Sequence, residues 1–217
     1  MTVRNRGALA ALAAGVAALT GAALVACANQ PAGTVGADEA STLASAAPTT
    51  ASVPSVPVAA GELPAGPTTI PPVRLLIPEI GVTATVNAVG INERTNEFEV
   101  PPSVDQIGWY RYGPGLEAGA GSVVIAGHVD SAKQGKGAFF RLRELDQGDT
   151  LTATGSDGEA RRYRVVAREE YAKTKIPLDR YFARDGKPRL TLITCGGPFD
   201  AKARKYRDNI VVTAVPV

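Results

Sequence analysis

The chain has 217 residues, of which 23 are basic and 21 acidic, so its net charge is only +2. A charge this balanced argues against a broad phosphate-tracking surface, and we therefore set nucleic-acid binding aside. Two cysteines and one histidine are too few for a four-ligand Cys/His zinc site or a disulfide-dense scaffold. We expect neither a metal ion nor another cofactor in this protein.

Residues 1–28 have the pattern of a membrane-directed segment. Arg4 and Arg6 precede a stretch of apolar or small residues over 7–28. This order is typical of a secretory signal, but the stretch is also long enough to span a bilayer. Its Leu-Val-Ala-Cys run, which ends at Cys27, resembles a lipoprotein lipobox. Two alternatives stay open, a lipoprotein lipidated at Cys27 and an uncleaved single-pass anchor, and both place the domain on the extracytoplasmic face of the cell membrane.

Residues 29–72 have the composition of a linker. They contain eight of the sixteen prolines, many Ala, Ser and Thr residues, and three charged residues, Asp38, Glu39 and Glu62. Such a segment buries too little apolar surface to offset its ordering entropy, and its prolines keep it extended. We therefore expect a disordered Pro/Ala/Thr-rich linker that holds the following domain away from the membrane.

Residues 73–217 are expected to form the folded domain, since all aromatic residues lie between Phe98 and Tyr206. Short apolar or alternating runs are separated by Gly/Pro turns, and residues 155–158 read as a hairpin loop. Helical periodicity is weak, with 137–145 as the best short candidate. The pattern predicts an all-β sandwich or closed barrel. Its eight candidate strands are 73–77, 82–89, 107–110, 122–127, 150–154, 163–168, 189–194 and 210–215.

Two of these apolar strands run into residues with catalytic chemistry. Residues 122–127 precede His128, the only imidazole in the sequence, and residues 189–194 precede Cys195. A lone histidine at a strand end is more often a rim residue, and a lone cysteine is more often an inert small hydrophobe. In an exported protein, however, an unpaired thiol is a liability, and Cys27 in the membrane segment is not available to pair with it. A retained thiol therefore indicates a function.

Arg207 adds a third group, because it opens a further apolar strand shortly after Cys195. A thiolate is a nucleophile, a nearby imidazole helps to ionise it and then protonates the leaving amine, and a guanidinium stabilises an oxyanion. Together the three groups fit acyl transfer through a thioester. His128 precedes Cys195, which excludes the papain order, and the Ser-His-Gly-Cys element of L,D-transpeptidases is absent from the sequence.

These positions sit in a set of motifs that resembles the sortase family, specifically the class F type of actinobacteria. The resemblance covers essentially residues 73–217, and a Thr-Leu-Ile-Thr-Cys run followed about a dozen residues later by Arg before a Val/Ile strand is specific to the family. The motifs are Arg74-Leu-Leu-Ile-Pro-Glu-Ile-Gly81, Gly108-Trp-Tyr110, Ala126-Gly-His-Val-Asp-Ser131, Leu192-Ile-Thr-Cys-Gly-Gly197, Phe199-Asp200 and Tyr206-Arg-Asp-Asn-Ile-Val-Val212.

The resemblance implies a closed eight-stranded barrel with one or two short helices, and it implies a role for several residues. Cys195 would be the nucleophile, His128 the general acid and base, and Arg207 the group that stabilises the oxyanion, with Arg204 as the alternative for that last role. Two neighbours of the cysteine, Thr194 and Gly196, would contact the substrate. Asp130 would either steer His128 or simply end its strand.

The resemblance further implies a cysteine transpeptidase. It would cleave a Leu-Pro-x-Thr-Gly-like sorting signal of surface proteins between Thr and Gly and transfer the acyl group to an amine, such as that of a peptidoglycan precursor or another protein. Its partners would also include the cytoplasmic membrane, bound through the N-terminus. Two other functions stay open: a lipid-anchored β-domain that only binds cell-wall or protein ligands, and a cysteine endopeptidase that hydrolyses the same thioester.

Overall fold

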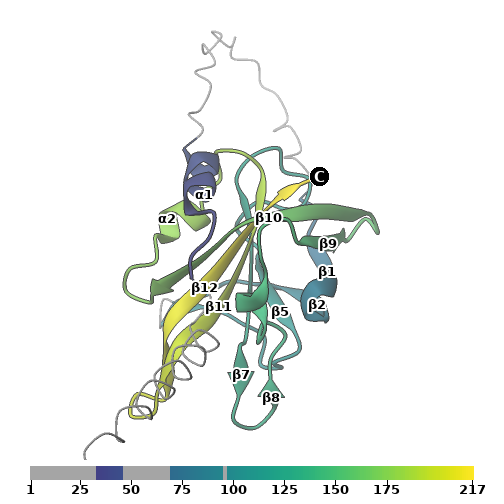
Figure 1. Cartoon of the computed structure of the whole chain (residues 1–217). Coiled ribbons are helices and arrows are strands. Elements are labelled where there is room, and N and C mark those ends of the chain that lie inside the picture. The colour runs from purple at the N-terminus through teal and green to yellow at the C-terminus, as the bar shows by residue number, and fades with distance from the viewer. Residues whose placement is uncertain (1–32, 46–68, 95–96) are drawn as a thin grey trace, which may run out of the picture. The chain divides into compact units, whose positions relative to one another are not determined.

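The protein is described by a computed structural model over residues 33–45, 69–94 and 97–217. Its strands close into a barrel, which confirms the fold class predicted from the sequence (Figure 1). In spatial order the barrel strands are β1 (Pro72–Ile77), β2 (Val82–Val89), β5 (Ile107–Tyr110), β6 (Ser122–Gly127), β11 (Arg189–Asp200), β12 (Lys205–Pro216), β10 (Ala160–Ala172) and β9 (Thr150–Gly155). Each of the eight predicted runs lies within one of these strands.

Short elements decorate the barrel. Two small hairpins pair β3 (Ile91–Asn92) with β4 (Glu97–Phe98), and β7 (Asp130–Ser131) with β8 (Gly135–Lys136). The described helices are α1 (Ala37–Ala44), α2 (Leu178–Tyr181) and the 3₁₀ turns η2 (Pro78–Ile80) and η3 (Leu142–Glu144). The helix candidate over 137–145 is therefore reduced to the single turn of η3.

The core follows from the alternation of side chains along the strands. In β11, Leu190 and Leu192 point into the barrel, and in β12 Ile210 and Val212 do the same. The intervening residues of both strands therefore point outward. Because antiparallel and parallel partners share a face, the pairing of β11 with β12 and β6 decides which outward side chains become neighbours.

The predicted hairpin loop is confirmed. Residues 155–158 connect β9 with β10, which pair antiparallel, and Gly158 has a φ of 81°. A left-handed conformation of this kind favours glycine, which explains the glycine at position 158.

The structure departs from the predicted disordered linker over residues 33–45. Here Val35 forms a β-bridge with Arg168 of β10, and α1 buries Ala40 and Leu43 to 3% and 7% exposure. β9 pairs only with residues 160–164 of β10, so the edge of β10 at Arg168 is open to Val35.

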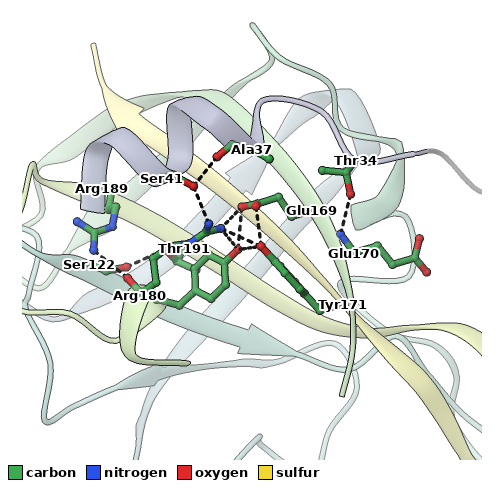
Figure 2. Close-up of polar contacts among 11 residues, drawn as sticks. Thr34, Ala37, Ser41, Ser122, Glu169, Glu170, Tyr171, Arg180, Arg189 and Thr191 are labelled. Carbon is green, nitrogen blue, oxygen red and sulfur yellow. Dashed lines mark hydrogen bonds and ion pairs between the residues drawn. The ribbon is translucent and has the colours of Figure 1, made fainter. Parts of the chain in front are cut away.

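Glycines let this segment approach the barrel closely. A Cβ at Gly36 would lie 2.0 Å from the carbonyl oxygen of Val166, so only glycine fits where the chain crosses β10. At the other end of α1, the backbone N–H of Lys187 donates to the carbonyl of Leu43 at 3.1 Å. Arg180 of α2 donates to Ser41 of α1 at 3.0 Å (Figure 2). These contacts could not be predicted from composition, because each of them forms only with the folded barrel.

The remaining parts of the predicted anchor and linker, 1–32 and 46–68, lie outside the described residues, so their boundaries stay predictions. Within the described ranges, no helix has the length and apolar character needed to cross a membrane.

Candidate active site

The parallel pairing of β6 with β11 brings the predicted imidazole and thiol side by side. The pairing ends with Ala126 opposite Ile193. Cys195 lies in β11 two residues after Ile193, and His128, which directly follows β6, lies two residues after Ala126. Neighbouring strands lie about 4.8 Å apart, and residues two positions along a strand return to the same face. Both side chains therefore leave the same outer face at the same end of the barrel.

A side-chain bond fixes this end of the two strands. The Thr194 hydroxyl, 5% exposed as a residue, donates to the carbonyl of Gly127 at 2.8 Å. It thus ties together the residues that directly precede Cys195 and His128. The predicted substrate residue Thr194 is therefore engaged with the barrel through its hydroxyl.

Antiparallel pairing extends the row across two more strands. Cys195 pairs with Asn209 of β12, and Asn209 pairs with Tyr171 of β10. Arg207 lies two residues from Asn209 and shares its face. Beyond the end of β10, the backbone N–H of Lys173 donates to the carbonyl of Arg207 at 3.0 Å. This outer strip thus carries a thiol, an imidazole, a guanidinium and an ammonium.

The thiol of Cys195 is free and half-buried, as a nucleophile that must meet a substrate requires. Among the described residues its hydrogen-bond partner is Lys173, whose Nζ lies 3.4 Å from Sγ. The half-buried imidazole of His128 places Nε2 2.9 Å from the carbonyl oxygen of Pro101. A carbonyl oxygen only accepts, so Nε2 carries a hydrogen atom and is the donor in its hydrogen bond with Pro101.

Arg207, rather than Arg204, lies on the strip beside Cys195. Its side chain is 66% exposed, and a guanidinium nitrogen lies 3.4 Å from the Asp200 carboxylate. Backbone N–H groups of Ala203 and Lys202, and then the Arg207 guanidinium, lower the pKa of Asp200. Arg204 is exposed in the turn between β11 and β12, with a φ of 51°.

The two glycines after Cys195 allow close backbone packing. Gly196 is buried, and a Cβ there would lie 2.6 Å from Cγ1 of Ile210. Gly197 has a φ of 69°, and a Cβ would lie 1.8 Å from the Asp208 carboxylate. Both positions require glycine for reasons of space or conformation. The register of β11 shifts here, between Gly196 and Phe199, which ends the regular row of side chains.

Asp130 contacts a neighbouring hairpin. Its carboxylate accepts a hydrogen bond of 2.6 Å from the hydroxyl of Tyr206, at the start of β12. This bond raises the pKa of Tyr206, because the neutral phenol is the donor. The bond joins β7 to β12 across the same end of the barrel. The imidazole of His128 is oriented instead by the carbonyl of Pro101.

Three contacts of the site were missed by sequence reasoning: Lys173 at the sulfur, Pro101 at the imidazole, and Tyr206 at Asp130. Lys173 stands in a Lys-Thr-Lys run that has the composition of an ordinary loop. Only the pairing of β10 with β12 brings it to Cys195.

Within the part of the chain that the structure describes, no group of three or more His, Cys, Asp or Glu side chains is arranged to hold a metal ion. The predicted lipidation residue Cys27 lies outside that part.

Known proteins resemble this chain in sequence and in fold. A family model, the Sortase domain, matches residues 75–217. Sortase C-1 from Actinomyces oris is 21% identical, with a TM-score of 0.52, over 66% of this chain and 72% of that one. A lid mutant of sortase A from Corynebacterium diphtheriae is 23% identical, with a TM-score of 0.52, over 70% and 73%. Group B Streptococcus pilus island 1 sortase C2 is 19% identical, with a TM-score of 0.50, over 66% and 72%. No curated protein matches the sequence significantly.

The chain belongs to the sortase family, because the family model covers well over half of it. The similar solved structures share its barrel. Membership supports a cysteine transpeptidase function in general, with sorting-signal proteins and amine nucleophiles as the kinds of partner that sortases use at the cell surface.

Proposed function

We propose that this protein is a membrane-anchored class F sortase, which cleaves a Leu-Pro-x-Thr-Gly-like signal and transfers the acyl group to an amine. The observation that carries the proposal is the free, half-buried thiol of Cys195, level with His128 at the end of two parallel strands. Arg207 lies on the same outer strip. A catalyst needs its nucleophile and its proton carrier as neighbours on an accessible surface, whereas a ligand-binding barrel has no such requirement.

In the acylation step, the Cys195 thiolate attacks the threonyl carbonyl carbon of the signal. The carbonyl electrons move to oxygen, and the Arg207 guanidinium stabilises this oxyanion. The C–N bond then breaks, and the imidazolium of His128 gives its proton to the leaving amine of glycine. The products are a thioester that joins the amino-terminal part of the signal to Cys195, and a released carboxy-terminal fragment whose new N-terminus is glycine.

In the second step, the acceptor amine attacks the thioester carbonyl. His128, now neutral, takes a proton from the attacking nitrogen, and Cys195 leaves as the thiolate. The acceptor is an amine of a peptidoglycan precursor or of another protein, because amine nucleophiles are the kind of partner that the sortase family uses. Water in place of the amine would give hydrolysis, the endopeptidase outcome.

The experiment uses the detergent-solubilised full chain, a labelled Leu-Pro-x-Thr-Gly peptide and a small amine, with product masses as the readout. Wild type should form the amide product and a trapped thioester at Cys195, and Cys195→Ala should form neither. Arg207→Lys should lose most of the turnover, because an ammonium cannot reproduce the planar fork of a guanidinium. Equal product from wild type and Cys195→Ala would refute the mechanism, and peptide binding without cleavage would support the ligand-binding alternative.

For the membrane end, we propose attachment through residues 1–28 on the extracytoplasmic face, either by a lipid on Cys27 or by an uncleaved anchor. The intact mass of the membrane-extracted protein separates these alternatives. A mass increase from acyl chains on a chain beginning at Cys27 would support the lipoprotein, and an unmodified full-length chain would support the anchor.

A further inference from the structure

The sulfur and the imidazole of the candidate active site have different polar partners in the structure. Sγ of Cys195 accepts from the ammonium of Lys173 at 3.4 Å, while Nε2 of His128 donates to the carbonyl of Pro101 at 2.9 Å. The cation in contact with the thiol is therefore a lysine that the sequence motifs do not contain.

The fold fixes the position of Lys173 through its backbone. Its N–H donates to the Arg207 carbonyl at 3.0 Å, which continues the pairing of β10 with β12 by one more residue. The N–H of Lys175 then turns back to the carbonyl of Ala172 at 2.8 Å. Lys173 is half-buried on the strip, whereas Lys175 is exposed in the turn. The backbone on both sides of the Lys173 side chain is therefore hydrogen-bonded, and this fixes the point from which the side chain reaches Sγ.

Other charged and titratable groups face the same end of the barrel. From β12 come Arg207, whose guanidinium contacts Asp200, and Asp208, whose carboxylate packs against Gly197. A further pair, Tyr206 with Asp130, lies between β12 and β7, and His128 follows β6. Among these cations Lys173 is the one in hydrogen-bond contact with the sulfur, and Coulomb attraction is strongest at the shortest distance.

We propose that Lys173 is a further catalytic residue, whose ammonium is the counter-ion of the Cys195 thiolate and so leaves His128 free to carry protons. The inference rests on the proposed function and names one more group of that same site. If His128 were the counter-ion, a reactive thiolate would require a protonated imidazole at the same moment. An ammonium keeps its charge over a wider pH range than an imidazolium. Ionisation of the thiol and protonation of the imidazole thereby become separate events.

The test measures alkylation of Cys195 by iodoacetamide in the full chain as a function of pH, by mass analysis of the peptide that contains Cys195. The variants are Lys173→Met, Lys173→Gln and Lys173→Arg, with Lys175→Met as the matched control two residues away. Removing an opposite charge in contact with a thiolate should slow alkylation near neutral pH by about tenfold and move the midpoint of the pH profile upward. Lys173→Arg and Lys175→Met should behave like wild type.

A second probe reads the local charge directly. Iodoacetate is an anion and iodoacetamide is neutral, so a cation beside the sulfur raises the ratio of their rates. Lys173→Met and Lys173→Gln should lower this ratio, and Lys173→Arg should keep it. The thermal midpoint of each variant, compared with wild type, identifies any loss of fold, and Lys173→Gln serves if Lys173→Met does not fold.

Unchanged pH profiles and unchanged rate ratios in folded Lys173→Met and Lys173→Gln would overturn the inference. So would a tenfold loss of alkylation in His128→Ala with none in Lys173→Met, because the imidazole would then be the counter-ion. Neither assay uses a sorting peptide, so a negative result here leaves the proposed transpeptidase function to be judged by the peptide experiment, and the reverse also holds.

Discussion

The outer face of β10, β11 and β12 has a covered half and an open half, and the two differ sharply. In the covered half, under α1 and α2, Glu169 of β10 is only 2% exposed and pairs with Val211 of β12. In the next row along the same strands, Tyr171 marks the boundary, and Asn209 and Cys195 begin the open half. Both halves are formed by the outward-facing residues of the same three strands. They differ because α1 and α2 pack over one half only.

In the covered half, the carboxylate of Glu169 is satisfied from several sides (Figure 2). It accepts from the hydroxyls of Tyr171 at 2.6 Å and Tyr181 at 2.7 Å, and it pairs with the guanidinium of Arg180. Arg180 in turn donates to Ser41 of α1. We call this set of five residues the polar cluster. A buried carboxylate is tolerated only when it is paired and hydrogen-bonded in this way.

In the open half, the corresponding pair of Arg207 with Asp200 is loose and solvated. The Arg207 side chain is 66% exposed, compared with 19% for Arg180. Exposed ion pairs contribute little to stability, whereas breaking a buried pair leaves a charge without compensation. The comparison indicates that the covered half contributes more to the stability of the fold, whereas the side chains of the open half stay accessible to a substrate.

The largest expected effect is the loss of Arg180. Arg180→Met leaves the Glu169 carboxylate buried without its cation, and we expect a decrease of about 3 kcal/mol in the free energy of unfolding. Urea denaturation followed by circular dichroism measures it. Arg207→Met is the matched control, with stability near wild type but peptide turnover lower by about 100-fold. Equal stability losses in the two variants would contradict the division of the outer face.

Next is the contact that holds α1 on the barrel. Leu43 is 7% exposed, and Leu43→Ala should decrease the free energy of unfolding by about 2 kcal/mol. Leu178→Ala in α2, where the leucine is 52% exposed, is the control and should change it little. A Leu43→Ala protein as stable as wild type would show that residues 33–45 contribute nothing to the folded unit.

A third prediction concerns alkaline pH. Burial, and then hydrogen bonding to neighbours in the polar cluster, raise the pKa values of Tyr171 and Tyr181 above the ordinary tyrosine range. The folded state therefore holds these protons more tightly than the unfolded chain. Their stabilising effect is complete below about pH 10, where unfolded tyrosine titrates, and is lost as the pH rises above that value.

Tyr181→Phe removes part of this dependence. We expect a loss of about 1.5 kcal/mol at pH 7, because Glu169 loses a donor, together with a smaller further loss between pH 9 and 11 than in wild type. Tyr112→Phe, at a tyrosine that is 53% exposed, should keep the wild-type pH dependence. Unfolding curves at several pH values decide between these outcomes, and identical slopes in wild type and Tyr181→Phe would contradict the prediction.

The smallest expected effect is at Ser41, which links α1 to the polar cluster. Ser41→Ala removes the acceptor of one Arg180 donor and should decrease stability by about 0.5 kcal/mol. Thr42→Ala is the control, because the Thr42 hydroxyl donates to the backbone carbonyl of Asp38 within α1 itself. A larger effect in Thr42→Ala than in Ser41→Ala would mean that the helix, rather than its link to Arg180, carries the contribution.

The sequence predicted the barrel strands well, because alternation of apolar residues is a local signal that the barrel preserves. The one or two short helices that the resemblance implied are present, but the sequence did not locate α1 and α2, which are short and owe their stability to burial of residues such as Leu43 and Tyr181 against the barrel. Isolated helices of this length are not stable in water, so no local sequence pattern predicts them.

Of the candidate site, the strand ends at His128 and Cys195 were visible in the sequence as apolar runs that stop at reactive residues. Their neighbours were not visible. The contact of Lys173 with Cys195 joins the turn after β10 to β11 through the pairing of β10, β12 and β11, and that of His128 with Pro101 depends on the loop before β5. The roles proposed for these residues stay predictions that the experiments above test.

The sequence by itself determined the alternation that makes a barrel and the motifs that mark a sortase, since both are written in the order of neighbouring residues. The tertiary structure alone decided which groups meet outside the barrel: an ammonium at the thiol, a carbonyl at the imidazole, and a helix from the supposed linker over Glu169. The physical reason is register. Pairing between strands far apart in the chain sets which side chains share a row, and burial by distant segments sets which of those rows stay open to a substrate.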